Sequence, residues 1–124
     1  MATRILLVED DTIARRNIAA YLRRSQFDVE EASNGEEAVR LITSIDEYDV
    51  VVSDVRMPGM TNGVDVISFQ QRTSPGTACI LITAFGSDQL QKQAQTMGVV
   101  YLEKPLSLPD LIDVISNLTA ARKP

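Results

Sequence analysis

The feature that most constrains the fold is a repeated alternation of short apolar runs with amphipathic segments. The apolar runs cover residues 5–8, 29–32 (a weaker run), 50–52, 80–82 and 99–102. Most of them lack polar–apolar alternation, which is typical of parallel strands that helices cover on both faces. Five successive strand–helix units therefore predict an α/β domain with right-handed crossovers.

The segments between these runs show helical periodicity. In the first, Ala14, Ile18 and Leu22 lie on one helical face, and further helices are expected over residues 38–45, 64–72, 90–97 and 108–115. Residue types that favour helix ends support these assignments. The predicted N-caps are Thr12, Asn34 and Ser87, and Gly98 is predicted to end a helix.

Composition excludes several classes of function. The 124 residues suit one domain, expected over residues 1–120, with 121–124 as a tail or the start of a linker. Without histidine, a Ser-His-Asp triad, an imidazole metal ligand and a phosphohistidine are impossible, and the single Cys79 permits no internal disulfide. The net charge of −5 disfavours direct binding of nucleic acid.

Membrane insertion and secretion are not expected either. No apolar run approaches the roughly 20 residues that span a bilayer. The first residues, MATR, lead directly into an apolar run without the layout of a signal peptide. We therefore expect the protein to work in the cytoplasm.

Polar side chains follow the apolar runs at the ends where open parallel sheets place their sites. They are Glu9, Asp10 and Asp11 after the first run, Asp54 after the third, Thr83 after the fourth and Lys104 after the fifth. Clustered carboxylates repel one another, and hard oxygen ligands favour Mg²⁺, or Mn²⁺, as their partner. An aspartate can also act as a nucleophile in phosphoryl transfer, which a lysine and a hydroxyl would assist. Each residue alone would fit a cap, a turn or a solvated loop, but together they favour a site.

Four sequence blocks give the chain a resemblance to a known family. They are LLVEDD at residues 6–11, SDVRMPGM at 53–60, LITA at 81–84 and YLEKP at 101–105. In these blocks the chain resembles the receiver domain of bacterial two-component response regulators, the chemotaxis-regulator-like fold. The resemblance extends over essentially the whole chain. It implies a single doubly wound (βα)5 domain whose parallel sheet has the flavodoxin-like strand order 2-1-3-4-5.

The resemblance also implies a role for each matching residue. Asp54 would accept a phosphoryl group, Thr83 and Lys104 would contact its oxygens, and Tyr101 would be the switch aromatic. The Mg²⁺ ligands would be Glu9, Asp10, Asp54 and the backbone carbonyl of Arg56. The donor would be a sensor histidine kinase or a histidine phosphotransfer protein, and a downstream effector would recognise the altered surface of the fourth helix, fifth strand and fifth helix. Such a domain is not a separate enzyme, because it assists only its own phosphorylation and dephosphorylation.

Three features qualify this comparison. The loop at Thr61-Asn62-Gly63 is one residue longer than is usual in the family. In receivers, the positions that match Arg56 and Phe85 flank the path of hydrolytic water. We therefore hypothesise that Phe85 restricts this water and prolongs the phosphoryl lifetime; a partner contact is the alternative. In this family the first helix borders the face where a kinase docks, so its arginines would contribute to docking or else form an ordinary solvated surface: Arg15, Arg16, Arg23 and Arg24.

Other functions fit the sequence less well. A phosphatase of the haloacid-dehalogenase type would carry a second aspartate where this chain has Arg56, and would need a cap domain. Flavin binding would need a Ser/Thr/Gly-rich loop after the first strand, where this chain has acids that would repel the cofactor phosphate. A degenerate receiver, which acts as an interaction module without being phosphorylated, stays open as the alternative.

Overall fold

The computed structural model describes residues 2–44 and 47–122, and it confirms the predicted α/β architecture. The strands of this part are β1 (Arg4–Val8), β2 (Asp28–Ala32), β3 (Val50–Asp54), β4 (Ala78–Thr83) and β5 (Val100–Glu103). The helices are α1 (Thr12–Arg24), α2 (Gly35–Ile42), α3 (Gly63–Thr73), α4 (Asp88–Met97) and α5 (Leu108–Arg122). All strand pairs are parallel, in the order β2-β1-β3-β4-β5.

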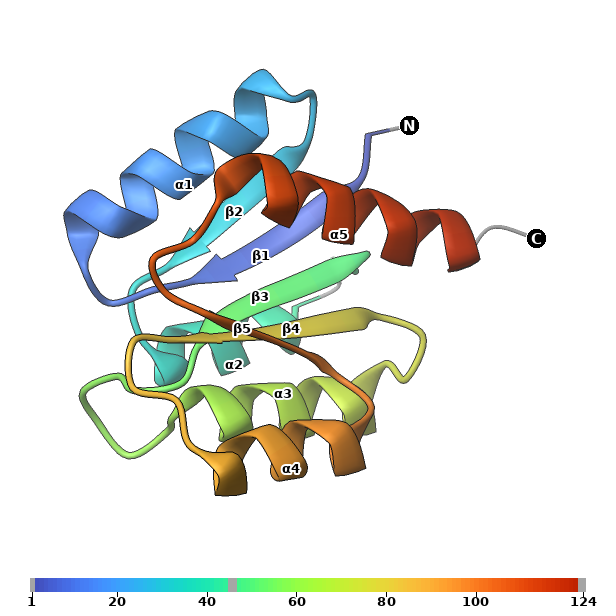
Figure 1. The fold of residues 1–124 in the computed structure, drawn as a ribbon. Helices are drawn as coiled ribbons and strands as arrows, with labels where there is room; N and C mark the ends of the chain where they lie inside the picture. Colours follow the sequence, from blue (N-terminus) through green and yellow to red (C-terminus); the bar gives the residue numbers. More distant parts are fainter. Residues whose placement is uncertain (1, 45–46, 123–124) are drawn as a thin grey trace.

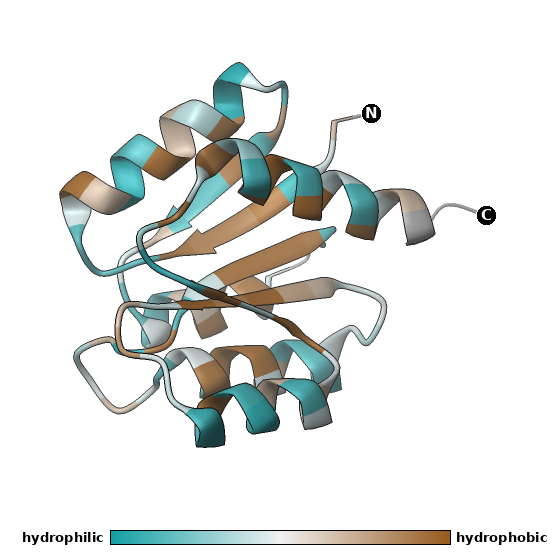
Figure 2. Ribbon diagram, viewed as in Figure 1, coloured by the Kyte–Doolittle hydropathy of each residue, from teal (hydrophilic) through white to brown (hydrophobic). Residues whose placement is uncertain are grey.

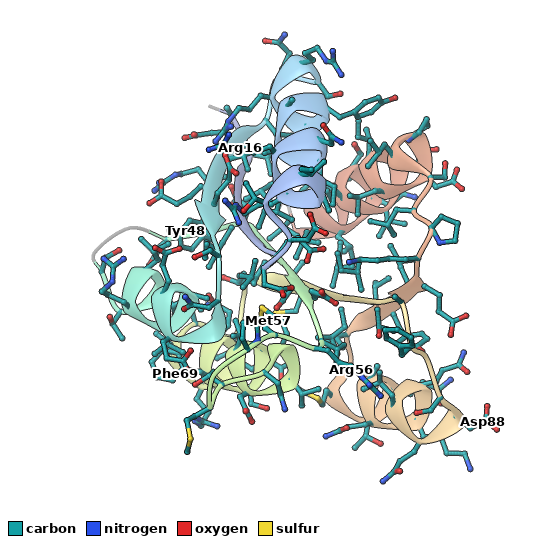
Figure 3. The ribbon with its side chains drawn as sticks, turned by 90° about the vertical axis from the view of Figure 1, so that its left-hand side faces the viewer. Arg16, Tyr48, Arg56, Met57, Phe69 and Asp88 are labelled. Carbon is teal, nitrogen blue, oxygen red and sulfur yellow. The ribbon has the colours of Figure 1, made fainter. Side chains whose placement is uncertain are left out.

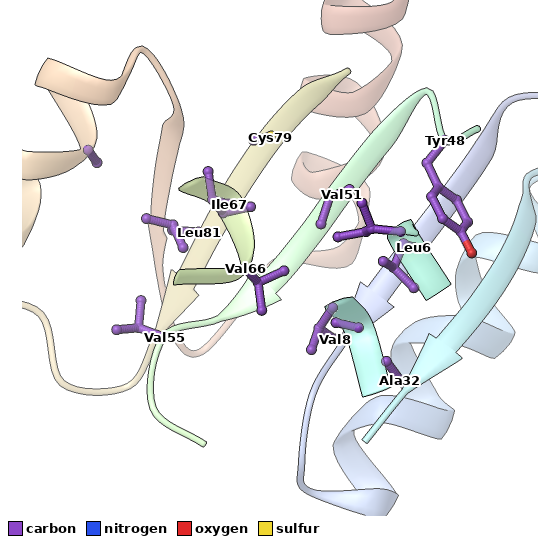
Figure 4. Close-up of a cluster of buried hydrophobic side chains, with 13 residues drawn as sticks. Leu6, Val8, Ala32, Tyr48, Val51, Val55, Val66, Ile67, Cys79 and Leu81 are labelled. Carbon is purple, nitrogen blue, oxygen red and sulfur yellow. The ribbon is translucent and has the colours of Figure 1, made fainter. Parts of the chain in front are cut away.

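Helices cover the sheet on both faces, with α1 and α5 on one side and α2, α3 and α4 on the other (Figure 1). Successive side chains of a strand point to opposite faces, so β1 contributes Leu6 and Val8 to one core and Ile5 and Leu7 to the other. Figure 4 shows the core on the α2–α3 side, and Figure 2 shows the apolar strands between helices with polar outer surfaces. Burial on both faces explains why the strand sequences lack alternation.

The edge strands depart from this pattern. The central strands β1, β3 and β4 are almost completely buried, whereas β2 carries the partly exposed Glu30 and Glu31, and β5 is only half-buried. The expectation of burial on both faces therefore holds for the central strands alone. An edge strand has a neighbouring strand on one side only, so its outer side stays open to solvent.

Helix ends follow the expected capping chemistry, with one correction. Thr12 is not the N-cap of α1 but its first residue, because the side chain of Asp11 accepts a hydrogen bond from the N–H of Ala14 at 3.0 Å. A carboxylate at this position also interacts favourably with the helix dipole. The structure confirms the other predicted helix ends, at Asn34, Ser87 and Gly98.

Two predictions from the sequence fall partly outside the described residues. The apolar stripe of α2 was expected to continue to Ile45, which lies outside the described residues. Helix α5 continues through Arg122, and residues 123–124 of the expected tail also lie outside them. Among the helices of the described part, none has both the length and the apolar character required to cross a bilayer.

Candidate functional site

Three acidic side chains meet at the carboxyl ends of β1 and β3. Val8 pairs with Ser53 in the sheet, so Glu9 and Asp54 lie side by side at the ends of neighbouring strands. Carboxylate oxygens of Glu9, Asp10 and Asp54 all lie within 4.8 Å of one another. Glu9 and Asp54 are buried, whereas Asp10 is exposed. An all-oxygen cluster of this kind could hold a hard divalent cation.

Lys104 enters the same cluster from the end of β5. Its Nζ donates to Glu9 Oε1 at 2.6 Å and to Asp54 Oδ2 at 3.5 Å. Burial acts to lower the pKa of Lys104, but the hydrogen bond to Glu9 and the charge of Asp54 outweigh it and leave the pKa raised. The ammonium is therefore positively charged at neutral pH and bridges two of the three carboxylates.

The cluster has more negative than positive charge, because one ammonium faces three carboxylates. The pKa of Asp10 is raised, mainly by desolvation and then by its hydrogen bond with Glu9 and the charge of Glu9. A nearby like charge disfavours the ionised form of a carboxyl group. The chemistry and geometry of the donors therefore fit a bound Mg²⁺ that would offset this repulsion.

We predict that Asp10→Asn stabilises the metal-free protein and removes most of its stabilisation by Mg²⁺. The substitution relieves repulsion within the cluster but also removes a ligand, whereas wild-type protein should gain about 2.7 kcal/mol when Mg²⁺ is present at 100 times its Kd. Chemical unfolding with EDTA and with Mg²⁺ measures both effects. Asp11→Asn is the matched control, because asparagine is an equally good N-cap. Equal Mg²⁺ stabilisation of wild-type and Asp10→Asn proteins would contradict the prediction.

Thr83 is buried at the end of β4, beside the acidic cluster. Its neighbour Ile82 pairs with Asp54 in the sheet, so Thr83 lies one residue beyond the level of Asp54. The Thr83 Oγ1 accepts a hydrogen bond from the N–H of Phe85 at 3.1 Å. This hydrogen bond links the hydroxyl group to the loop between β4 and α4.

Tyr101 lies on β5 and contacts the same loop. Its ring packs against the core on the α2–α3 side, and its hydroxyl donates to Glu103 Oε2 at 3.1 Å. A Cβ added at Gly86 would overlap both the Tyr101 hydroxyl and the Glu103 carboxylate. The loop after β4 therefore passes closely over the Tyr101–Glu103 pair, and Glu103 is a contact that the sequence did not reveal.

Arg56 and Phe85 form a pair at the rim of the site. The guanidinium carbon of Arg56 lies 5.2 Å from the centroid of the Phe85 ring, within the range of a cation–π interaction. Figure 3, which looks onto the carboxyl ends of the strands, shows Arg56 on the side of this edge nearest α4. The Phe85 side chain is 66% exposed. The two residues that sequence comparison placed beside the water path thus contact each other.

The arginines of α1 are not equivalent. Arg15 and Arg23 both pair with Glu31 of β2, at 3.2 and 3.0 Å, and Arg15 Nη1 also donates to the backbone carbonyl of Glu9 at 3.0 Å. Arg15 therefore supports the start of the acidic cluster, whereas Arg23 ties the exposed surface of α1 to β2. Arg16, Arg23 and Arg24 keep the exposed positions expected of a docking or solvated face, and Arg24 lies over Tyr21.

Comparison with known proteins identifies the family. The model of the response regulator receiver domain matches residues 5–116. The chain belongs to this family. The receiver is 32% identical over 123 residues to the chemotaxis protein CheY of Halobacterium salinarum, covering 98% of this chain and 100% of that protein. It is 36% identical over 116 residues to the transcriptional regulatory protein PdtaR of Mycobacterium tuberculosis, covering 90% of this chain.

Solved structures agree with this assignment. The receiver superimposes on a response regulator receiver protein from Sinorhizobium medicae with a TM-score of 0.88 at 27% identity, covering 98% of both chains. A receiver domain from Clostridium thermocellum gives a TM-score of 0.89 at 29% identity, covering 97% of this chain and 96% of the other. The receiver spans only part of several curated relatives: 54% of the Mycobacterium protein and 27% of a cyclic di-GMP phosphodiesterase of Thermotoga maritima. In response regulators, domains of this family interact with kinases and effector domains.

Proposed function

We propose that this receiver accepts a phosphoryl group on Asp54 from a partner's phosphohistidine and passes the signal to an effector. The observation that carries the proposal is the position of Lys104, whose ammonium contacts both Asp54 and Glu9 within the carboxylate cluster. This is not a surface ion pair, because the Lys104 side chain is only 25% exposed and the Glu9 side chain only 1% exposed. A nucleophilic carboxylate beside a fixed positive charge is what phosphoryl transfer requires.

The chemistry follows from the positions of the side chains. One carboxylate oxygen of Asp54 attacks the phosphorus, the new P–O bond forms as the P–N bond breaks, and the departing imidazole takes up a proton. Lys104 donates to one phosphoryl oxygen. Thr83 can donate its hydroxyl proton to another, since its Oγ1 at present accepts from Phe85.

The proposed metal site consists of Glu9, Asp10, Asp54 and the backbone carbonyl of Arg56. Mg²⁺ (or Mn²⁺), when bound there, would neutralise charge on the phosphoryl oxygens. The chain itself provides the oxygen ligands and places two of them at the ends of adjacent buried strands. These rigid strand ends fix the separation of Glu9 and Asp54.

The signal would pass through Thr83 and Tyr101. Movement of the Thr83 hydroxyl toward the phosphoryl group would break its hydrogen bond with the Phe85 N–H. The loop that lies over Tyr101 would then shift. Tyr101 would then exchange its contact with Glu103 for an inward position, and the surface of α4, β5 and α5 would change. Phosphorylation biases an existing equilibrium between these states.

The remaining assignments follow from this role. We propose that residues 1–120 form the receiver domain and that it acts in the cytoplasm, where a histidine kinase or phosphotransfer protein supplies the phosphoryl group. Direct contact with nucleic acid is not part of the proposal, because the chain is acidic. The receiver would have no substrate other than its own phosphodonor and phosphoaspartate.

Intact-protein mass spectrometry after incubation with acetyl phosphate tests the proposal. The expected result is the mass of one added phosphoryl group, dependent on Mg²⁺ and absent in Asp54→Ala. A parallel Mg²⁺ titration tests metal binding separately. Wild-type protein that binds Mg²⁺ but gains no mass, both from acetyl phosphate and from kinases of two-component systems, would identify a degenerate receiver instead.

We predict that Phe85→Ala speeds loss of the phosphoryl group several-fold. The substitution removes the ring that lies against Arg56 and so opens the rim of the site to water. The decay of the phosphorylated mass with time measures the rate. Met60→Ala is a suitable control, because Met60 is also apolar and is 95% exposed. An unchanged decay rate in Phe85→Ala would favour the alternative role of Phe85 as a partner contact.

A further inference from the structure

The loop between β3 and α3, which begins directly after Asp54, is fixed at both ends. At its close, the N–H of Gly63 donates to the carbonyl of Val55 at 2.9 Å. Asn62 and Asp65 then form a reciprocal capping box, with hydrogen bonds of 3.0 and 3.1 Å. This is the loop in which the resemblance indicates one additional residue, and it projects from the carboxyl edge of the sheet (Figure 1).

The second half of this loop is held by Glu36, in the first turn of α2. Glu36 Oε2 accepts hydrogen bonds from the backbone N–H groups of Met60 at 3.1 Å and Thr61 at 2.8 Å. The pKa of Glu36 is lowered, first by a hydrogen bond with the Thr61 side chain and then by backbone hydrogen bonds. The carboxylate therefore stays ionised at neutral pH, and its place near a helix N-terminus also favours negative charge.

The contact between α2 and the loop is closely fitted. A Cβ at Gly35 would overlap the backbone carbonyl of Thr61. Gly59 has a φ of +97°, and a Cβ there would lie 2.7 Å from Glu36 Oε1. Glycine is thus required on the helix and in the loop for Glu36 to reach the two N–H groups.

We propose that Glu36 is a positioning residue for the metal site. Without it, the unanchored stretch between Val55 and the capped Asn62 covers residues 56–61; with it, this stretch shortens to residues 56–59, in which Pro58 restricts the backbone further. Arg56 lies at the start of this stretch. Glu36 therefore limits the orientations open to the Arg56 carbonyl, one of the proposed metal ligands, an inference that rests on the proposed Mg²⁺ site.

Three variants separate positioning from general stability. Glu36→Ala removes the acceptor, and Glu36→Gln keeps a carbonyl oxygen that can accept both N–H groups. Glu37→Ala is the matched control: Glu37 is the next residue of α2, and its Oε1 accepts from the N–H of Ser33 at 2.7 Å, away from the loop. Backbone hydrogen exchange without metal reports on Met60 and Thr61, and calorimetric titration gives the Kd for Mg²⁺.

The expected result is faster exchange at Met60 and Thr61 and about tenfold weaker Mg²⁺ binding in Glu36→Ala, as for other residues that orient metal ligands. Glu36→Gln should recover most of the affinity, and Glu37→Ala should bind Mg²⁺ like wild type. Unchanged Mg²⁺ affinity in Glu36→Ala, or equal weakening in Glu37→Ala, would overturn the positioning role alone. Wild-type protein that binds no Mg²⁺ would overturn the proposed metal site, and this inference with it.

Discussion

Replacing Lys104 with alanine is expected to slow phosphorylation of Asp54 by about 100- to 1,000-fold, the usual cost of removing one fixed donor to a developing negative charge. The loss has a clear structural origin, because Lys104 Nζ bridges Asp54 and the buried Glu9. The rate of phosphorylation at saturating Mg²⁺ measures the effect. Lys92→Ala, which removes an exposed lysine of α4, controls for the change in net charge.

The same variant should also be less stable, by about 2 kcal/mol. Leaving one partner of a fully buried ion pair alone costs roughly 3–5 kcal/mol, but the partial exposure of Lys104 reduces that cost here. Because the pKa of Lys104 is raised above 10.5, its contribution should be fully present at neutral pH and disappear as pH rises through the raised value. A Lys104→Ala protein with wild-type stability and rate would contradict both the ion pair and its chemical role.

Gly63→Ala is expected to cost about 3 kcal/mol of stability, at the upper end of the usual range for overpacking, and to impair phosphorylation as well. A Cβ at Gly63 would overlap the backbone carbonyl of Asp54, and backbone atoms cannot move aside as a flexible side chain can. The clash would displace the end of β3 and, with it, the nucleophile. Urea unfolding and the phosphorylation rate measure the two effects.

Gly98→Ala provides the comparison for this prediction. Gly98 ends α4 with a φ of +73° and has nothing within 4 Å of an added Cβ, so alanine there meets backbone strain but no clash. The expected cost is about 1–2 kcal/mol, with a normal rate of phosphorylation. Gly63→Ala with a normal rate would show that the position of Asp54 does not depend on close packing at Gly63.

Much of the fold could be predicted because hydrophobic periodicity is a local property. The runs at residues 50–52 and 80–82 became the buried β3 and β4, and Gly98 ended a helix as its conformational freedom suggests. The N-cap of α1 was misplaced by one residue because Asp11 and Thr12 both favour that position. The resemblance to the receiver family, rather than periodicity, supplied the strand order.

The candidate site was partly predictable from the geometry of a parallel sheet. In a parallel sheet the residues after each strand meet at one edge, so Glu9, Asp54 and Lys104 could be expected to converge. The supporting residues could not. Arg15 and Glu36 act through backbone atoms, six positions away for Arg15 and 25 for Glu36, and such contacts depend on loop conformation, which hydrophobic periodicity does not encode.

The ion pair between Lys104 and Glu9 also bears on how the protein is made. It joins residues 95 positions apart, from the first strand to the last, although β1 and β5 are not neighbours in the sheet. During synthesis, Asp54 and the acidic residues leave the ribosome long before Lys104. A nascent chain therefore carries the acceptor without its ammonium, so the ability to accept a signal should arise only when the last strand has joined the fold.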